Sequence, residues 1–307
     1  MTGPVPLQPD PGMIGGIAQA PFALPPDPKR LFARRAARFD ALADASPMAP
    51  YLYFLGALTA IQADLAAALP RPEAPALDRI ALARTGGMPI LDRARLADAP
   101  QLSDAMERLF AEARTVAKPV AAEHALHEVI ACDDAARRAM AANVLADTIP
   151  FDAVAQHLYV AAAVQVYATL CAGALSAADL APVAVGVCPA CGGPPVASMV
   201  VGFQGAEGVR YAVCSCCATQ WNEVRVKCLA CGSTKGIGYR AVDDGGDDAT
   251  VKAEVCDECH GWLKIFHQNR NPSLDPVADD VGSLGLNLLM RDTDYRPAGF
   301  NPFLVGY

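Results

Sequence analysis

The sequence predicts an α+β protein in which a helical N-terminal domain precedes two small β-modules in tandem and a C-terminal helix. Apolar residues recur at helical spacing through most of the chain before Pro182, and abundant alanine favours helix there. After Pro182, short β-rich runs alternate with glycine-containing turns. Nine of the eleven cysteines fall between Cys188 and Cys259, a clustering that favours metal binding.

Composition limits the classes of function. The chain has 307 residues, 53% of them apolar and 19% charged, as expected of a folded protein long enough for two domains or more. Its net charge of −8 argues against a general nucleic-acid or anionic-membrane binder. Residues 1–20 lack the pattern of a signal peptide, and the apolar stretch Leu158 to Leu180, interrupted by Gln165 and Asp179, is typical of a buried helix. We therefore expect a cytoplasmic protein without stable membrane insertion.

The chain opens with an irregular arm, residues 1–26, that is rich in proline and glycine. Asp27 and Pro28 then supply an N-cap and a first helical position, and they open a helical domain over residues 27–181. The apolar side of the first helix consists of Leu31, Phe32, Phe39 and Leu42. Its basic residues are Lys29, Arg30, Arg34, Arg35 and Arg38. We expect this basic side to be solvated, with an acidic partner as the alternative.

Further helices are predicted at about 50–69, 119–131, 133–147 and 151–175. Ser103 is expected to cap another. Several prolines and the pair Gly86-Gly87 predict a long connection with little regular structure over 70–101. No segment before residue 182 has a clear strand pattern.

Two β-hairpins are predicted after Pro182. The first joins Val196–Phe203 to Val209–Val213, and Trp221–Lys227 would add a third strand. The second joins Ile237–Val242 to Thr250–Val255. The first module is expected at 182–226 and the second at 227–271.

Residues 272–307 form the predicted C-terminal helix and tail. Asp275-Pro276 opens the helix, and Phe300 and Phe303 are expected to hold the tail against the body of the protein.

Four Cys-x-x-Cys pairs, called knuckles here, lie at the ends of the hairpins. Two thiols at this spacing can bind one metal, because the tight turn places both sulfurs on one side; Gly192 and Gly232 follow two of the knuckles, where a positive φ completes such a turn. Each hairpin returns the chain beside its start, so neighbouring knuckles should pair. The predicted ligands are Cys188, Cys191, Cys214 and Cys217 in one site, and Cys228, Cys231, Cys256 and Cys259 in the other. Both modules are therefore expected to be rubredoxin-like or of the zinc-ribbon kind.

The ligand set leaves the metal open. Four thiolates suit zinc, which would be structural, or a single iron, which would add one-electron chemistry. Thioredoxin-like thiol exchange is disfavoured because that motif is a single Cys-x-x-Cys at the start of a helix. Cys216 is a spare thiol. We expect it to be exposed or packed nearby, with ligand exchange or a redox role as the alternative.

Other metal-binding combinations are weaker. His124 and His127, beside Glu123 and Glu128, are more typical of a solvated helix face than of a metal site. His157 is expected to make an ordinary hydrogen bond in a helix. His260 is a weaker ligand candidate than Cys259. Four aspartates at a hairpin tip lack the spacing of a calcium loop: Asp243, Asp244, Asp247 and Asp248.

Catalysis and nucleic-acid binding are both disfavoured. The sequence has no nucleophile elbow, phosphate-binding loop or dinucleotide fingerprint, so we expect no enzyme activity. Residues 185–270 contain eight basic and nine acidic side chains, a net charge of −1, whereas a nucleic-acid ribbon would be clearly basic.

Several segments match one known family. They are Cys188–Gly192, Gly208–Tyr211, Trp221–Cys228, Lys252–Cys256, Leu263–Ile265, Ala278–Asp280 and Asn301–Phe303, with a fainter match over Leu31–Ala43. On these segments the chain resembles FdhE, the family of formate dehydrogenase accessory proteins. All eight knuckle cysteines match the family's cysteines, whereas His260 stands where a small residue is common and Cys216 is extra.

The resemblance implies a cytoplasmic, non-catalytic maturation factor with rubredoxin-like iron sites. Such a factor would bind the catalytic subunit of a molybdenum- or tungsten-dependent formate dehydrogenase before twin-arginine export, and would be required for its activity. Two alternatives stay open. One is a rubredoxin-like protein that passes electrons to or from the client enzyme, and the other is a nucleic-acid-binding zinc ribbon. Neither the oligomeric state nor the client-binding surface follows from the sequence.

Overall fold

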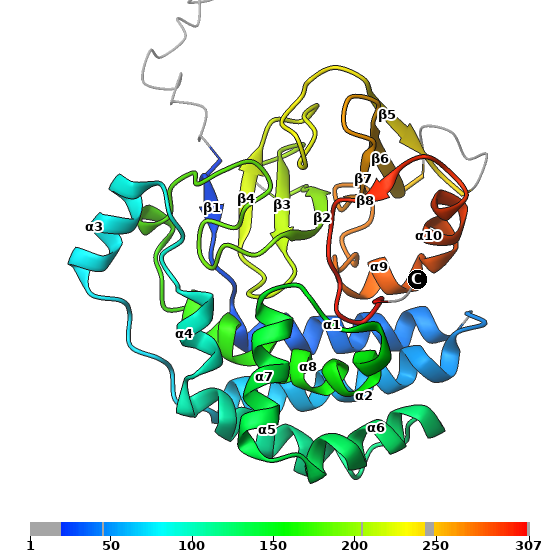
Figure 1. Cartoon of the computed structure of the whole chain (residues 1–307). Helices are drawn as coiled ribbons and strands as arrows, with labels where there is room; N and C mark the ends of the chain where they lie inside the picture. The colour runs from blue at the N-terminus through cyan, green and yellow to red at the C-terminus, as the bar shows by residue number, and fades with distance from the viewer. Residues whose placement is uncertain (1–19, 45, 204, 243–248, 306–307) are drawn as a thin grey trace, which may run out of the picture.

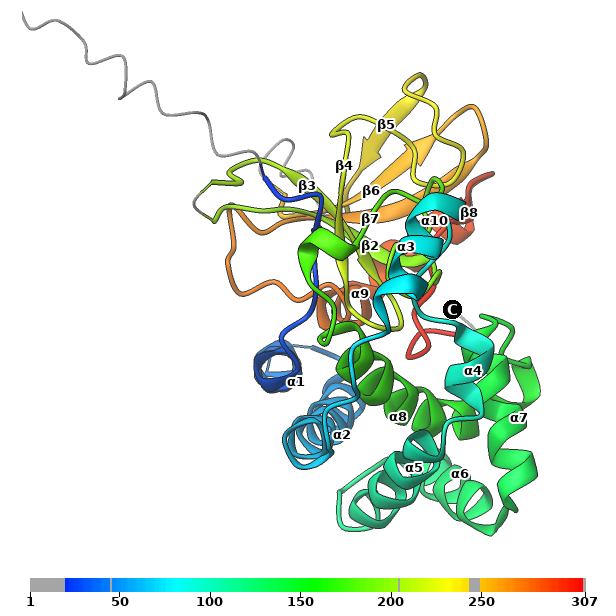
Figure 2. The ribbon, with the colours of Figure 1, turned by 90° about the vertical axis from the view of Figure 1, so that its left-hand side faces the viewer.

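The protein has two layers, a group of helices and a twisted sheet above it (Figure 1; Figure 2 shows the same layers from the side). The computed structural model describes residues 20–44, 46–203, 205–242 and 249–305. The predicted fold class is confirmed: a helical N-terminal part is followed by a sheet with two four-cysteine clusters and then by C-terminal helices.

The helical part is built around one apolar helix, α8. The elements are α1 (Pro28–Ala43), α2 (Ala49–Ala68), α3 (Leu77–Gly86), α4 (Arg93–Ala97), α5 (Pro100–Ala113), α6 (Val120–Ala131), α7 (Asp134–Leu145) and α8 (Val154–Ala172), with 3-10 turns η1 (Phe151–Ala153) and η2 (Ala177–Asp179). Helices α1, α2, α5, α6 and α7 all contact α8, and nearly every α8 side chain is buried. By length and composition, α2 and η1–α8 could each span a membrane, but most of each lies inside the protein.

The predicted connection over 70–101 was wrong, because it contains helices α3 and α4. Gly87 (φ 59°) is the left-handed C-cap of α3, so the glycine pair that suggested a loop ends a helix instead. Asp92 caps α4 by accepting hydrogen bonds from the amides of Ala94 and Arg95. Helix α5 begins at Pro100 rather than after Ser103, since proline is well suited to the first turn.

The basic side of α1 is only partly solvated. Arg35 is buried, and its Nε lies 3.0 Å from Asp275 Oδ1. Arg38 Nη2 lies 2.6 Å from Asp279 Oδ1. The acidic partners of these two arginines therefore lie within the chain. The side chains of Asp275 and Asp279 hold α1 against the segment that contains α9. The predicted cap does form, because Asp27 accepts a hydrogen bond from the Lys29 amide (3.1 Å).

One continuous sheet contains both β-modules. Its strands are β1 (Ala23–Leu24), β2 (Pro195–Val200), β3 (Arg210–Cys214), β4 (Gln220–Glu223), β5 (Ile237–Arg240), β6 (Val251–Cys256), β7 (Gly261–His267) and β8 (Arg296–Pro297). They lie in the order β1-β4-β3-β2-β7-β6-β5, and β8 pairs with β7. The two hairpins, β2–β3 and β5–β6, are antiparallel. The modules join where β2 runs parallel to β7, with Ser198 opposite Ile265.

Two strand predictions need correction. The expected irregular arm includes β1, which pairs with β4, and two residues are too few to produce a readable strand pattern. The expected strand Trp221–Lys227 ends at Glu223. Beyond it, the backbone bends around Arg210, whose Nη1 donates to the carbonyl oxygens of Val224, Arg225 and Lys227 at 3.3, 3.4 and 2.8 Å.

The C-terminal helix is broken into α9 (Ala278–Gly282) and α10 (Leu284–Arg291). The helix was expected to open at Asp275-Pro276 but begins at Ala278; Asp275 Oδ1 accepts hydrogen bonds from the amides of Val277 and Ala278 at its start. The tail is held as expected: Phe303 is buried, and its carbonyl accepts a hydrogen bond from Tyr51 (2.8 Å).

Candidate metal centres

The first four-cysteine cluster lies at one end of the β2–β3 hairpin. Cys188 and Cys191 precede β2, Cys214 ends β3, and Cys217 follows in the turn before β4. The sulfurs of Cys188 and Cys217 are 3.7 Å apart, those of Cys191 and Cys214 are 3.5 Å apart, and all four lie within 4.8 Å of one another. A tetrahedral ion with bonds of about 2.3 Å separates its sulfurs by about 3.8 Å, so the arrangement fits one ion.

The second cluster repeats this geometry on the β5–β6 hairpin. Cys228 and Cys231 precede β5, Cys256 ends β6, and Cys259 precedes β7. The sulfur–sulfur distances are 3.6 Å for Cys228 and Cys259 and 3.8 Å for Cys231 and Cys256. All eight thiols are free, and disulfide bonds of about 2.05 Å are excluded by these separations. The structure therefore brings the eight predicted residues together in the pairing that the hairpins suggested.

A left-handed residue follows every knuckle. The φ angles are 78° at Gly192, 58° at Ala218, 79° at Gly232 and 55° at His260. In three of the turns this residue donates its amide to the carbonyl of the first cysteine, at 2.8–3.0 Å. Sequence reasoning identified the two glycines but missed Ala218 and His260, because only the repeated turn geometry reveals them. A side chain in this conformation costs roughly 1–2 kcal/mol.

Backbone amides also face the sulfurs. Cys214 Sγ accepts from the amides of Cys216 and Cys217 at 3.4 and 3.5 Å. In the second cluster, Ala230 N donates to Cys228 Sγ (3.3 Å) and Gly261 N to Cys259 Sγ (3.4 Å). Such N–H dipoles stabilise the thiolate form that a metal requires.

The two clusters differ in exposure. All four thiols of the first are buried, whereas Cys231 and Cys259 of the second are exposed. Burial raises the pKa of the Cys188 and Cys217 thiols, since a buried anion loses its hydration. Four thiolates are stable together only around a cation, so both clusters could hold a metal ion; the donor set suits zinc and iron alike.

Cys216 is buried beside the first cluster but is not one of its four close sulfurs. It is therefore packed near the site, one of the two expectations for a spare thiol. Arg93 of α4 lies close by: burial lowers its pKa, but the sulfurs of Cys216 and Cys191 and the Asp147 carboxylate outweigh that effect and raise it.

The weaker metal candidates behave as ordinary side chains. His127 Nε2 lies 3.2 Å from Glu123 Oε1 on an exposed face of α6, and Lys118 also binds this carboxylate. His157 is buried, and its Nδ1 is 2.7 Å from the carbonyl oxygen of Ala153. His260 stacks near Tyr295, with ring centroids 5.9 Å apart. The aspartates of the predicted hairpin tip lie outside the described residues.

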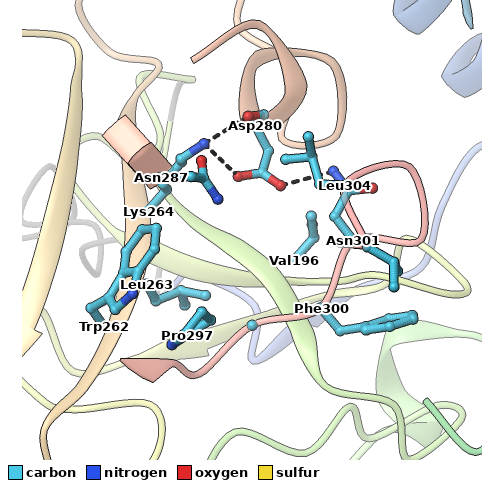
Figure 3. A pocket seen from close by; sticks show the side chains of 12 residues that line it. Val196, Trp262, Leu263, Lys264, Asp280, Asn287, Pro297, Phe300, Asn301 and Leu304 are labelled. Carbon is cyan, nitrogen blue, oxygen red and sulfur yellow. Dashed lines mark hydrogen bonds and ion pairs between the residues drawn. The ribbon is translucent and has the colours of Figure 1, made fainter. Parts of the chain in front are cut away.

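Three separated segments that carry the family resemblance meet in one cavity of about 180 Å³ (Figure 3). Lys264 Nζ lies 2.9 Å from Asp280 Oδ1 and donates to the Asp280 carbonyl at 2.6 Å. Asn301 donates to Asp280 Oδ2 at 2.8 Å. These contacts link β7, α9 and the tail, which explains why short motifs far apart in sequence belong to one pattern.

Comparison with known proteins covers nearly all of the chain. The models described as "FdhE, N-terminal", "FdhE, central domain" and "FdhE, C-terminal domain" match residues 20–185, 187–225 and 226–304. A "Protein FdhE homolog" of Rhizobium meliloti (strain 1021) is 58% identical over 302 residues, 98% of this chain and 99% of that protein. A homologue of the same name from Pseudomonas aeruginosa is 32% identical over 292 residues, 93% of each chain.

A solved structure agrees with these matches. The crystal structure of the FdhE protein from Pseudomonas aeruginosa superposes with a TM-score of 0.82 at 30% identity, covering 93% of this chain and 99% of that one. The family models follow one another in chain order, and the two relatives match over 93–99% of their own length. The chain belongs to the FdhE family.

Proposed function

We propose that this protein is a non-catalytic accessory factor that binds the catalytic subunit of an exported formate dehydrogenase in the cytoplasm and is required for its activity. The observation that carries the proposal is membership of the FdhE family along almost the whole chain, with both four-cysteine clusters in place. The resemblance of these segments to formate dehydrogenase accessory proteins supplies the client. Association with the client before twin-arginine export follows from the same resemblance.

The eight knuckle cysteines are proposed to hold two metal ions, one in each cluster. Sulfur separations of 3.5–3.8 Å support this assignment. A bound ion would link the two ends of each hairpin and stabilise a module with a small core. Iron in a rubredoxin-like site and zinc in a ribbon differ in colour, so an optical spectrum of protein purified without oxygen, together with elemental analysis, distinguishes them.

The helical domain (27–181), the two modules (182–226 and 227–271) and the C-terminal segment (272–307) are proposed to present one surface to the client. The buried ion pairs between α1 and the segment around Asp275 support a rigid arrangement of these parts. A partner would therefore meet a preformed surface rather than separately moving modules.

Co-purification tests the client assignment. The tagged protein is expressed in cells that produce an exported formate dehydrogenase, and the cytoplasmic and membrane fractions are probed for its catalytic subunit. We expect recovery of that subunit from the cytoplasmic fraction, and loss of formate dehydrogenase activity when the accessory gene is deleted. The catalytic subunit of an unrelated exported molybdoenzyme is the control. Failure to recover the subunit, together with full activity in the deletion strain, would contradict the proposal.

A redox role is the second candidate, favoured by the exposed thiols of Cys231 and Cys259. An iron ion at that cluster would lie close enough to the surface to exchange electrons with a docked client. Visible absorption that bleaches reversibly with reductant, and loss of client activity when zinc replaces iron, would support this role. A client that is equally active with the zinc-loaded protein would exclude it.

A further inference from the structure

The two clusters differ in their exposure to solvent and in their contacts with the helical part. Each cysteine of the first cluster is at most 1% exposed, and backbone carbonyls in both of its knuckles accept hydrogen bonds from the helical part. The second cluster, on the β5–β6 hairpin, has two exposed cysteines. A metal held by four thiolates is an anionic group, and an anionic group removed from water needs compensating charge and hydrogen bonds.

Both knuckles of the first cluster are fastened to the helical part. Leu91 N donates to the carbonyl of Ala190 (2.8 Å), inside the first knuckle. Gln165 of α8 donates through Nε2 to the carbonyl of Ser215 (2.9 Å), inside the second. Pro89 packs so closely that a β-carbon on Gly192 would lie 2.9 Å from its Cγ. The four sulfurs are therefore held by turns that are hydrogen-bonded to α8 and to the connection between α3 and α4.

Arg93 places a cation beside this cluster. A β-carbon added to Gly193 would lie 3.1 Å from Arg93 Nη1, 3.3 Å from Cys214 Sγ and 3.5 Å from Cys191 Sγ, so the absent side chain lets the guanidinium and the sulfurs approach one another. Asp147 fixes the guanidinium with contacts of 2.8 and 3.0 Å. Arg93 Nε is buried and has no hydrogen-bond partner among the described residues.

We propose that Arg93 is a positioning residue that compensates the negative charge of the metal–thiolate group at the first cluster. The ion there would hold the helical part on the sheet, whereas the second cluster would release and reload its ion through solvent. The inference rests on the proposed metal binding. The two ions would then have different roles. The first ion permanently links the helical layer to the sheet, and the second ion exchanges with solvent.

Site-resolved alkylation of the metal-loaded, full-length protein tests these different roles. Excess chelator and N-ethylmaleimide are added, samples are quenched over time, and each cysteine is mapped by mass spectrometry. We expect two phases. Cys228, Cys231, Cys256 and Cys259 should be labelled first, with release of one ion per chain. Labelling of Cys188, Cys191, Cys214 and Cys217 should follow with the second ion, together with faster hydrogen exchange at the Leu91 amide.

Variants isolate the role of Arg93. Loss of a group that supports metal ligands costs about 10–100-fold in metal affinity, so Arg93→Gln should speed alkylation of the first cluster by about that factor and leave the second unchanged. Arg93→Lys keeps the charge and should restore part of the protection. Asp147→Asn, which frees the guanidinium but keeps it charged, should have a smaller effect. Arg95→Gln is the matched control, because Arg95 lies exposed on the same helix.

The outcomes separate this inference from the proposed metal binding. A protein that binds no stoichiometric metal would overturn both. Two bound ions that leave in a single phase, or earlier labelling of the first cluster, would overturn the assignment of different roles alone. An Asp147→Asn effect as large as that of Arg93→Gln would show that packing between α4 and α7, rather than the charge of Arg93, protects the site.

Discussion

Replacing Arg210 by methionine tests how the two modules are joined. The Arg210 side chain is fully buried on β3; its Nη2 lies 2.7 Å from Glu254 of β6, and its Nη1 donates to three carbonyls just before the second cluster. Removing one partner of a buried pair costs roughly 3–5 kcal/mol. A chain of 307 residues shifts its Tm by about 1.5 °C per kcal/mol, so Tm should fall by roughly 5–8 °C in a calorimetric or circular-dichroism melt of the metal-loaded protein.

The control and the pH dependence sharpen this prediction. Arg225→Met makes the same chemical change at an exposed neighbouring position and should alter stability by less than about 0.5 kcal/mol. Burial already raises the pKa of Glu254, and removing Arg210 should raise it further. A carboxyl whose folded pKa exceeds its unfolded pKa destabilises the fold when ionised, so the deficit should shrink as the pH falls towards the unfolded pKa. Equal effects of Arg210→Met and Arg225→Met would refute the reasoning.

Three further predictions concern the knuckles and the ion pair between Lys264 of β7 and Asp280 of α9. Cys216→Ser should retain two ions by elemental analysis, whereas Cys217→Ser should lose tight binding of one; equal metal contents would contradict the ligand assignment. Ala218→Gly relieves a left-handed alanine and should raise the urea midpoint by the equivalent of about 0.5–1 kcal/mol, so an unchanged or lower midpoint counts against strain there. Lys264→Met leaves the buried Asp280 carboxylate without its cation and should cost roughly 3–5 kcal/mol, measured by chemical denaturation; a change below about 1 kcal/mol would argue against a stabilising pair.

Local patterns in the sequence were enough to predict the knuckles and the hairpins. Spacing identified all eight cysteines, and the knuckles that pair are those at the two ends of one antiparallel hairpin, which returns the chain beside its start. Helix α1 was predictable because Asp27 caps it and Pro28 is its first residue, so the signal lies in the helix's own sequence.

Contacts between distant segments were not predictable in this way. The parallel pairing of β2 with β7 joins residues more than sixty positions apart, and no local signal specifies it. Arg35 and Arg38 were expected mainly in solvent, because their partners Asp275 and Asp279 lie at the other end of the chain. Arg93 was not recognised for the same reason, since its role depends on a knuckle about a hundred residues later. The pair Gly86-Gly87 could indicate either a loop or the end of a helix, because glycine is common in both. In the structure, Gly87 is the C-cap of α3.

Native mass spectrometry of the full-length protein, purified without oxygen, tests whether each four-cysteine cluster holds one metal ion. The mass difference between native and denatured spectra counts bound ions, and alkylation of the denatured sample counts free thiols. We expect two ions per chain and eleven reduced cysteines, with loss of one ion for each cluster disrupted by serine substitution. A chain that carries no ion, or one whose knuckle cysteines are linked by disulfide bonds, would contradict it.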